Sequence, residues 1–334
     1  MTRLEPREYS KRVGVLTHEQ LQAALERFGL GELLAAEPAP SGLFGQNVML
    51  SASTGEYVLR GAPWPAWQLP QERCIAEIIH TRTTVPAPWP YLIDEGTDIF
   101  GWTFAIMPRI AGECVANHRE LAPTKRLAMA QAMGEGLAAL HAPPFEALAK
   151  YDPEVGRFMP VGEPYDDWFR AYARDWLMRC REASDATTDA DESWVESVIA
   201  DAKDALAVPF VPALVHHDYK ENNLVFLRES DGRWRVNGIF DLMECYVADG
   251  EFDLARTFTG HAIDRPELAF AFLDAYAAMR GLRPGFAERF RLYLLVDRLI
   301  IWEYGQRNGI WFRPGQRFRE YAEPGVAIDL SRYG

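Results

Sequence analysis

The stretch HHDYKENNLVF, residues 216–226, decides how the rest of the chain is interpreted. It places Asp218, Lys220 and Asn223 in one short polar loop between the apolar runs FVPALV and NLVF. Asp and Asn are common turn formers and Lys is a common solvated charge, so such a loop on its own indicates a turn more often than a site. The other residues of the chain must decide whether this loop handles phosphate.

Phosphoryl transfer from a nucleotide needs a carboxylate that accepts the proton of the attacking hydroxyl, oxygen ligands for Mg²⁺, and positive charge near the transferred group. Asp218 has the chemistry of the base, Asn223 that of a magnesium ligand and Lys220 that of a γ-phosphate partner. A second acidic ligand follows in VNGIFDLMEC (236–245), where Asp241 ends an apolar run. A tight hairpin would place Asp241 beside Asn223, because antiparallel strands joined by a short loop stay adjacent.

The first hundred residues alternate between helical and strand-like patterns. THEQLQAALERFGL (17–30) carries leucines at helical intervals after a Thr N-cap and predicts a helix. NVMLS and EYVLRG flank the turn ASTG and predict a β-hairpin. A helix in PQERCIAEIIH (70–80) and strands around YLIDEG and WTFAIMPRI follow. These patterns predict a small α+β lobe.

After residue 112 the pattern becomes mostly helical. APTKRLAMAQAMGEGLAALH (122–141) predicts a long amphipathic helix, and only residues 212–241 of this half look strand-like. We also expect helices at 165–183, 191–206, 266–280 and 286–305. We therefore predict an α+β, bilobal fold with a ligand in the cleft between the lobes.

The composition is that of a globular protein with an acidic surface. The chain has 334 residues, 48% hydrophobic and 25% charged, which favours two domains. The net charge of -13 argues against a nucleic-acid partner and favours a cationic small substrate. No run is long and apolar enough to span a membrane, and the N-terminus lacks the apolar core of a signal peptide. We therefore expect a cytoplasmic protein with no membrane partner.

The four cysteines stand far apart in the sequence. They form no C-x-x-C pair and no Cys/His cluster at zinc spacing. We expect buried thiols in a reducing compartment. The cysteines are Cys74, Cys114, Cys180 and Cys245.

HHDYKENNLVF together with IFDLMEC resembles the catalytic and metal-binding segments of kinases. The order of the pieces resembles most closely the aminoglycoside phosphotransferase and choline-kinase superfamily, in which H-x-D-x-x-x-x-N precedes an I-D-hydrophobic segment and then G-D-x-x-x-D-L-A. Here these pieces are residues 216–223, IFDL (239–242) and ADGEFDLA (248–255). GLAALHAPP (136–144) resembles the helix end with an L-H pair that precedes the catalytic region of the family. The similarity spans about residues 40–260.

The resemblance implies a protein-kinase-like bilobal fold, ATP or GTP as phosphate donor, Mg²⁺ as cofactor and a small-molecule hydroxyl as acceptor. Residues 1–108 would form the nucleotide-binding lobe with a leading helix, and residues 109–334 the helical lobe with the catalytic loop and acceptor site. Asp218 matches the catalytic base, and Asn223 and Asp241 match the magnesium ligands. 

Two further residues match the family at structural positions. His216 matches the residue that braces the loop, although a packed histidine without a kinetic role explains it about equally well. Asp253 matches an acid that ties the following helix to the catalytic loop.

The nucleotide side of the pattern is less regular. Gly42 and Gly45 occupy the place of the phosphate-covering loop, although a plain hairpin turn explains two glycines almost as well. Arg60 stands where many relatives carry the Lys that binds the α- and β-phosphates, and a guanidinium can bind phosphate bidentately. On the next helix Glu72 lies nearer the apolar face than Glu77, so Glu72 is the better partner for Arg60. A solvated helix-start carboxylate explains Glu72 about equally well.

FAIMPRIAG matches the connection between the lobes. The backbone of Ile106, Met107 and Arg109 would offer hydrogen bonds to a purine. His217 stands where Gly is frequent in the family, and a larger side chain there would narrow the acceptor pocket. Lys220 is closer to the protein-kinase version of the loop than to many small-molecule kinases.

The acceptor site lies in the part of the family that diverges most. Trp302 and Trp311 have the chemistry to stack on a ring or a quaternary ammonium, although aromatics at helical spacing are more often core. The acidic candidates for acceptor binding are Glu244, Asp249, Asp297 and Glu303.

The leading hypothesis is a kinase for a small-molecule hydroxyl, with an aminoglycoside-type antibiotic, and hence antibiotic resistance, as the first candidate. A metabolic kinase for choline, homoserine or a sugar, and a macrolide kinase, are the alternatives. A nucleotide-binding pseudokinase scaffold is the non-enzymatic alternative. The complete set of Asp218, Asn223 and Asp241 argues against that scaffold, and the lack of Asp-Phe-Gly and Ala-Pro-Glu segments argues against a protein kinase.

Overall fold

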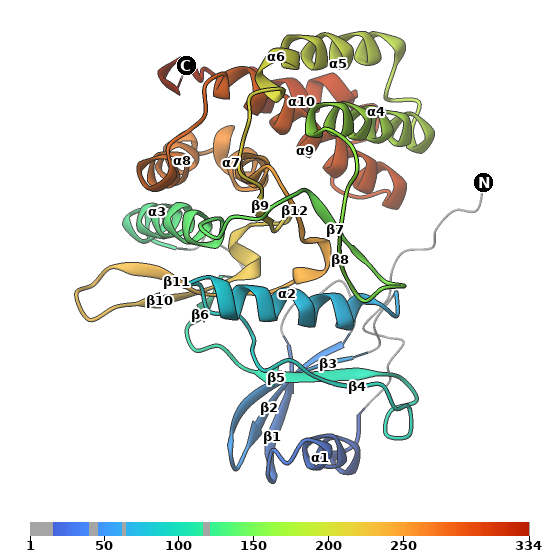
Figure 1. The fold of residues 1–334 in the computed structure, drawn as a ribbon, viewed down its shortest axis with the longest axis vertical. Coiled ribbons are helices and arrows are strands. Elements are labelled where there is room, and N and C mark those ends of the chain that lie inside the picture. Colours follow the sequence, from blue (N-terminus) through green and yellow to red (C-terminus); the bar gives the residue numbers. More distant parts are fainter. Residues whose placement is uncertain (1–15, 40–45, 62–64, 116–120, 334) are drawn as a thin grey trace.

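The computed structural model describes residues 16–39, 46–61, 65–115 and 121–333. A small lobe built on an antiparallel sheet lies beneath a larger lobe that is mostly helical (Figure 1). The fold is therefore the α+β architecture with two lobes that the sequence predicts.

The small lobe contains a five-stranded antiparallel sheet with the order β1-β2-β3-β5-β4. The strands are β1 (Leu33–Pro38), β2 (Gln46–Ala52), β3 (Gly55–Gly61), β4 (Leu92–Asp94) and β5 (Phe104–Pro108). The predicted hairpin is the β2–β3 pair. Helix α1 (His18–Arg27) begins at Thr17, which forms a capping box with Gln20, and packs Leu21 and Leu25 on the sheet core.

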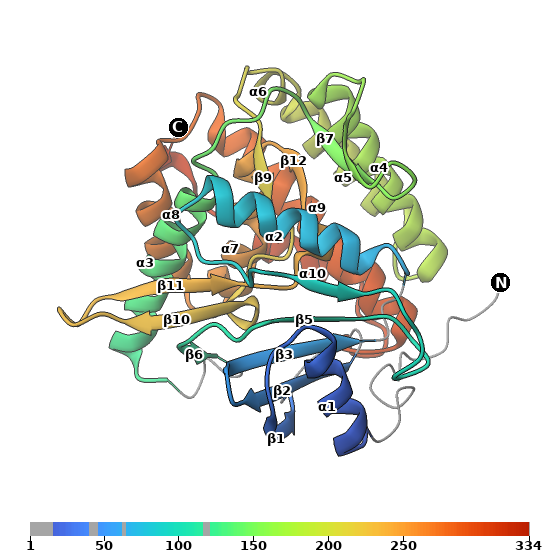
Figure 2. The ribbon, with the colours of Figure 1, turned by 60° about the horizontal axis from the view of Figure 1, so that its bottom comes forward.

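Helix α2 (Gln68–Arg82) lies between the sheet and the helical lobe (Figure 2). Its apolar residues Leu69, Ile75 and Ile79 are fully buried and belong to the core of the helical lobe. The helix therefore brings its polar side chains to the junction of the two lobes.

The helical lobe begins with α3 (Pro123–Leu140), which packs against α8 (Pro266–Arg280). Predicted helices 165–183 and 266–280 have these bounds in the structure, whereas 191–206 is divided into two helices. The remaining helices are α4 (Tyr165–Ala183), α5 (Asp189–Asp201), α6 (Lys203–Leu206), α7 (Leu254–Ala262), α9 (Phe286–Asn308) and α10 (Phe318–Val326).

Two small sheets follow the five-stranded sheet, and they correct the expectation that only residues 212–241 of this half form strands. One has the order β11-β10-β6 and the other β8-β7-β12-β9. Most of these strands have only two to four residues, too few to show an alternating pattern in the sequence. The strands are β6 (Glu113–Cys114), β7 (Ala149–Asp152), β8 (Arg157–Pro160), β9 (Ala213–Val215), β10 (Leu224–Arg228), β11 (Trp234–Ile239) and β12 (Tyr246–Ala248).

All four cysteines are free thiols. Cys180 and Cys245 are buried and Cys74 is partly buried, whereas Cys114 is exposed at the end of β6. The expectation of buried thiols is therefore wrong for Cys114. Among the described residues no helix is long and apolar enough to cross a membrane.

Candidate active site

The β10–β11 hairpin brings the two ends of the candidate site together. Leu224 pairs with Ile239, and the Phe240 N–H donates to Asn223 O at 3.1 Å. Asp241, the next residue, has a φ of 64°, in the left-handed region where Asn, Asp and Gly are the tolerated residues. The backbones that carry Asn223 and Asp241 are thus adjacent, as the sequence predicts.

Asp218 is held by its own loop. Its Oδ2 accepts hydrogen bonds from Lys220 Nζ at 2.6 Å and from Asn223 Nδ2 at 2.9 Å. Its Oδ1 lies 3.3 Å from Nε of Arg256, a residue of α7. Burial acts to raise the pKa of Asp218, but Arg256 and Lys220 outweigh it and hold the pKa below its ordinary value. Asp218 is therefore a carboxylate at neutral pH.

His216 and Asp253 fix the start of this loop. The fully buried His216 donates from Nε2 to Phe240 O at 3.0 Å. The backbone N–H groups of His216 and His217 donate to the two oxygens of Asp253 at 2.5 and 2.6 Å. His141, of the predicted L-H pair, lies 3.2 Å from Asp253 through its Nε2. The bracing position expected of His216 and Asp253 agrees with this geometry.

His217 has a left-handed backbone conformation, which favours glycine. Its φ is 71°, where a side chain is disfavoured. The ring contacts the rings of Tyr246 and Phe252, and its Nε2 lies 3.3 Å from Tyr172 Oη. Burial lowers the pKa of His217 to about 4, so the ring is neutral at pH 7.

Arg60 and Glu72 form a buried ion pair between β3 and α2. Arg60 Nη2 lies 2.7 Å from Glu72 Oε1 and 3.4 Å from Asp241 Oδ1. Glu72 is 3% exposed, whereas Glu77 is exposed on the same helix, so the helical geometry correctly selects Glu72. Tyr91 donates to the second oxygen of Glu72 at 2.7 Å, a partner that the sequence did not reveal.

Only some of the predicted nucleotide-binding residues are among those that the structure describes. Gly42 and Gly45 lie outside the described residues. Ile106 pairs with strands on both sides, whereas Met107 is one residue beyond the last pair with β4. The backbone N–H of Arg109 donates to Glu56 O at 2.9 Å, so it is not available to a purine. The prediction for Arg109 is therefore corrected.

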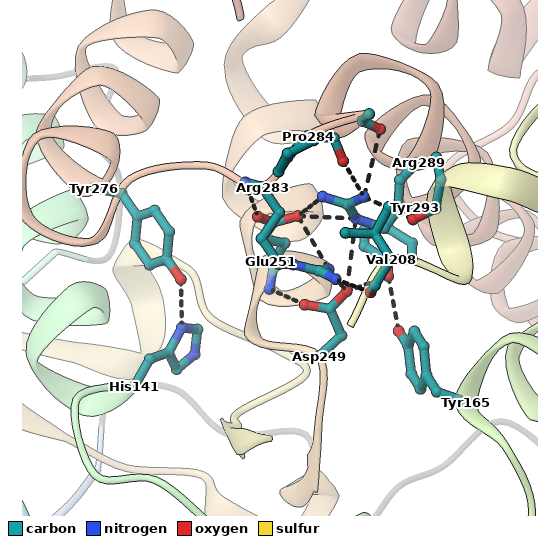
Figure 3. A network of polar contacts seen from close by, with 12 residues as sticks. His141, Tyr165, Val208, Asp249, Glu251, Tyr276, Arg283, Pro284, Arg289 and Tyr293 are labelled. Atoms are coloured by element: carbon teal, nitrogen blue, oxygen red, sulfur yellow. Dashed lines mark hydrogen bonds and ion pairs between the residues drawn. The ribbon is translucent and has the colours of Figure 1, made fainter. Parts of the chain in front are cut away.

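Asp249 is buried in an ion-pair network, which corrects its predicted role in acceptor binding. It is 2% exposed, pairs with Arg283 and accepts from Tyr293 Oη at 2.6 Å. Glu251 completes this buried network by pairing with Arg289, and Figure 3 shows the two carboxylates facing the two guanidinium groups. The network anchors the segment that precedes Asp253 to α9.

Asp297 and Glu303 on α9 are also paired with arginines. Asp297 Oδ1 lies 3.1 Å from Arg256 Nε, and Asp297 Oδ2 lies 2.9 Å from Arg298 Nη2. Glu303 pairs with Arg307, one turn along the same helix. These carboxylates are neutralised by the protein itself, which corrects their assignment as direct contacts for a cationic acceptor.

Three candidates for acceptor binding remain to be placed. Glu244 is exposed after Asp241. Trp302 is fully buried and donates from Nε1 to Thr187 Oγ1 at 3.0 Å, so it is a core residue. Trp311 is 61% exposed at a φ of 69° and lies over Tyr304.

The residues at the end of the hairpin fit a magnesium ion. Asn223 uses its Nδ2 as a donor to Asp218, which leaves its Oδ1 as a ligand, and Asp241 adds a partly exposed carboxylate. Mg²⁺ in nucleotide sites takes few protein ligands and completes its shell with phosphates and water. Among the described residues no cluster of three His, Cys, Asp or Glu side chains could hold a metal ion.

Known proteins resemble this chain in sequence and in fold. N-acetylmuramate/N-acetylglucosamine kinase of Caulobacter vibrioides is 34% identical over 154 residues, which cover 44% of this chain and 39% of that kinase. The match thus spans less than half of the relative's length.

Two solved structures share the fold. A thermostable mutant of aminoglycoside phosphotransferase APH(4)-Ia with ADP and hygromycin B has a TM-score of 0.63 at 18% identity, covering 93% of this chain and 97% of that chain. The GDP and kanamycin complex of APH(2″)-IIIa has a TM-score of 0.62 at 15% identity, covering 93% and 96%. Both similarities extend over both lobes.

A family model described as the phosphotransferase enzyme family matches residues 35–286. This range includes β3 with Arg60, the loop with Asp218 and the hairpin end with Asp241. The chain therefore belongs to the phosphotransferase enzyme family and has the fold of the aminoglycoside phosphotransferases.

Proposed function

We propose that this chain transfers the γ-phosphoryl group of ATP or GTP to a hydroxyl of a sugar-like small molecule, in a reaction that requires Mg²⁺. The observation that carries the proposal is the state of Asp218. One of its oxygens is fixed by Lys220 and Asn223, and the other accepts no hydrogen bond from the described residues. That second oxygen is available to accept the proton of an acceptor hydroxyl.

Each part of the proposed chemistry has a candidate residue. Asp218 would hold the acceptor hydroxyl and take its proton, and Lys220 would face the transferred phosphoryl group. Asn223 and Asp241 would hold Mg²⁺, which offsets charge on the phosphates. Arg60, oriented by Glu72, would bind the α- and β-phosphates.

The remaining nucleotide contacts complete the proposal. Gly42 and Gly45 would cover the phosphates, and the backbone at Ile106 and Met107 would meet the purine. The lobe boundary near residue 108 then separates nucleotide binding from acceptor binding. We propose that the reaction takes place in the cytoplasm.

We propose an uncharged or acidic sugar derivative as the acceptor. The kinase from Caulobacter vibrioides is named for N-acetylmuramate and N-acetylglucosamine, whose amine is acetylated and therefore uncharged. Asp249, Asp297 and Glu303, which were expected to attract a cationic acceptor, are paired with arginines. 

An aminoglycoside is the second candidate acceptor, and antibiotic resistance belongs to this alternative. It is favoured by the fold of structures that contain hygromycin B or kanamycin and by the exposed Glu244. Neither observation concerns a contact beside Asp218, so we rank it second.

A product assay tests the proposal. The protein is incubated with Mg²⁺ and ATP or GTP and separately with N-acetylglucosamine, N-acetylmuramate, hygromycin B and kanamycin, and phosphorylated products are detected by mass spectrometry. A phosphorylated amino sugar supports the proposal. Phosphorylation of the aminoglycosides alone supports the second candidate and rejects the first.

A further inference from the structure

Gln71 is a buried glutamine of α2, and no motif of the sequence identifies it. It is 6% exposed, and its Nε2 donates to Met243 O at 2.8 Å and to Cys245 O at 3.3 Å. A side-chain amide has two N–H donors, so both are used on one short segment of backbone. Gln71 therefore holds the turn that follows Asp241.

The segment that Gln71 holds begins at the proposed metal ligand. Asp241 has a φ of 64° and a ψ of 56°, and a short 3₁₀ helix, Leu242–Glu244, starts directly after it. A left-handed conformation is less stable for a residue with a side chain, so it persists where neighbouring contacts fix it. On the side before Asp241 the Phe240 N–H donates to Asn223 O. On the side after it, the contacts come from Gln71.

The next residue of α2 is Glu72, the partner of Arg60. Its Oε1 lies 2.7 Å from Arg60 Nη2 and accepts from Gln68 Nε2 at 2.9 Å. Its Oε2 accepts from Tyr91 Oη at 2.7 Å, so both oxygens are fixed by the protein. Because Gln71 and Glu72 are adjacent on one helix, α2 joins the proposed phosphate-binding group to the proposed metal-binding segment.

Helix α2 is well placed for this connection. It lies between the sheet and the helical lobe, and it packs against the 3₁₀ helix Leu242–Glu244 (Figure 2). Ile75, one turn after Gln71, is fully buried in the core of the helical lobe. The side chain of Gln71 is thus held on a helix that is itself anchored.

Two routes connect Arg60 to Asp241. The direct route is their ion pair at 3.4 Å, and the indirect route runs through Glu72 and Gln71. When a nucleotide binds, Arg60 and Asp241 would exchange their mutual contact for phosphate and Mg²⁺. The bonds of Gln71 go to backbone carbonyls, which such a ligand does not replace. The indirect route would therefore set the separation of the two groups in the nucleotide complex.

We propose that Gln71 is a positioning residue that places Asp241 relative to Arg60 and thereby makes nucleotide affinity depend on Mg²⁺. The inference rests on the proposed function, in which Asp241 is a magnesium ligand, and adds the residue that places this ligand. A glutamine that only satisfied two buried carbonyls would stabilise the fold without changing the response of the protein to Mg²⁺.

Calorimetry with ADP, with and without Mg²⁺, provides the test. The affinity with Mg²⁺ divided by the affinity without it is the magnesium ratio. Gln71→Met keeps an unbranched side chain and removes both donors. Gln71→Asn keeps the amide but is one methylene shorter, and it takes the place of Gln71→Met if that variant does not fold. Urea unfolding shows which variants are folded.

Gln22→Met is the matched control. Gln22 is a partly buried glutamine of α1, and its Nε2 also donates to a backbone carbonyl, that of Gly31, at 3.4 Å. The same substitution therefore removes a bond of the same kind within the small lobe. Gln22 belongs neither to α2 nor to the proposed site.

We expect Gln71→Met to lower the affinity for Mg-ADP roughly tenfold, which corresponds to the loss of one or two hydrogen bonds between uncharged groups. The affinity for ADP without Mg²⁺ should change little, so the magnesium ratio falls by about the same factor. Gln22→Met should keep the parental ratio. Added to Asp241→Ala, Gln71→Met should cause no further loss, because its effect acts through Asp241.

Four results would reject Gln71 as a positioning residue. The parent could bind ADP equally well with and without Mg²⁺, or the Gln71 variant could keep the parental magnesium ratio. The variant could also weaken ADP binding equally under both conditions, which would indicate a structural role alone. Finally, Gln71→Met could cause the same loss in Asp241→Ala as in the parent.

Phosphoryl transfer, measured separately, tests the proposed function. If the magnesium ratio changes as expected but no acceptor is phosphorylated, the role of Gln71 stands and the proposed function is rejected. If an acceptor is phosphorylated and Gln71→Met leaves the ratio unchanged, the role of Gln71 is rejected and the proposed function stands.

Discussion

Arg60 Nη2 lies 3.4 Å from Asp241 Oδ1, so a cation of the small lobe meets a carboxylate of the helical lobe. The same nitrogen is 2.7 Å from Glu72, which fixes it on the side of α2. Helix α2 is itself tied to the loop after Asp241, because Gln71 Nε2 donates to Met243 O at 2.8 Å. The proposed phosphate-binding and metal-binding groups are thus linked by direct contacts.

Asp241→Ala should abolish magnesium-dependent nucleotide binding. The other proposed protein ligand, Asn223, is a neutral amide, so the substitution removes the only carboxylate from the proposed pair. Calorimetry with ADP, with and without Mg²⁺, measures the effect. Asp231→Ala, in the exposed turn of the same hairpin, is the control. Equal affinities for Mg-ADP in Asp241→Ala and in the parent would reject Asp241 as a metal ligand.

Glu72→Gln should lower kcat/KM for the nucleotide at least about tenfold. The amide keeps the shape of the side chain but no longer offers a charged partner to the buried Arg60, and such hydrogen bonds are worth about 1.5–3 kcal/mol. Glu77→Gln, exposed on the same helix, should leave kcat/KM unchanged. Steady-state kinetics with varied nucleotide compares the two, and equal effects would contradict the role of Glu72.

Asp253→Asn should reduce the free energy of unfolding by about 1–3 kcal/mol and also lower kcat. The carboxylate accepts the backbone N–H groups of both His216 and His217, and an amide can accept only one of them through oxygen. Urea unfolding measures the loss. Asp274→Asn, on the surface and paired with Arg332, provides the control. A loss no greater than in this control would show that Asp253 does not hold the loop.

His217 should make the stability of the protein depend on pH between about 6.5 and 4. Burial lowers its pKa from 6.5 to about 4, so in this window the unfolded chain binds more protons than the fold, and stability falls as the pH falls. The loss should reach about 1–3 kcal/mol, allowing for partial exposure of the ring. His217→Asn tolerates the left-handed backbone and does not titrate.

Urea unfolding at several pH values compares His217→Asn with the parent. The parent should lose more stability than the variant between pH 6.5 and 4. Parallel pH profiles would show that the ring of His217 does not titrate differently in the folded and unfolded states.

The parts of the fold with long, regular patterns could be predicted from the sequence. The bounds of α4 and α8 match the predicted ranges, and the β2–β3 hairpin follows from its turn. Strands β7, β8 and β12 could not be found, because three or four residues carry no period and their pairing is set by the tertiary structure.

In the candidate site, too, some residues could be predicted from local sequence and others could not. Asp218, Asn223 and Asp241 are linked by a short hairpin, so local sequence was enough to bring them together. Tyr91 and Arg256 reach the site from distant elements, and no spacing in the sequence indicates that they do.

The acidic residues assigned to a cationic acceptor show most clearly what the sequence could not predict. Their charge can be read from the sequence, but their partners cannot. Arg283 neutralises Asp249, Arg256 and Arg298 flank Asp297, and Arg307 pairs with Glu303. Only the i,i+4 spacing of the last pair was visible in the sequence.

The central claim is that Asp218 accepts the proton of the acceptor hydroxyl. Its most direct test compares phosphoryl transfer to the best acceptor in the parent and in Asp218→Asn, with nucleotide affinity measured on the same samples by calorimetry. We expect kcat to fall by about 10²–10⁴-fold while the affinity for Mg-ADP changes little, because the base acts on the acceptor and not on the nucleotide. Retention of more than about a tenth of the parental kcat would contradict the claim, because general-base catalysis contributes more than that.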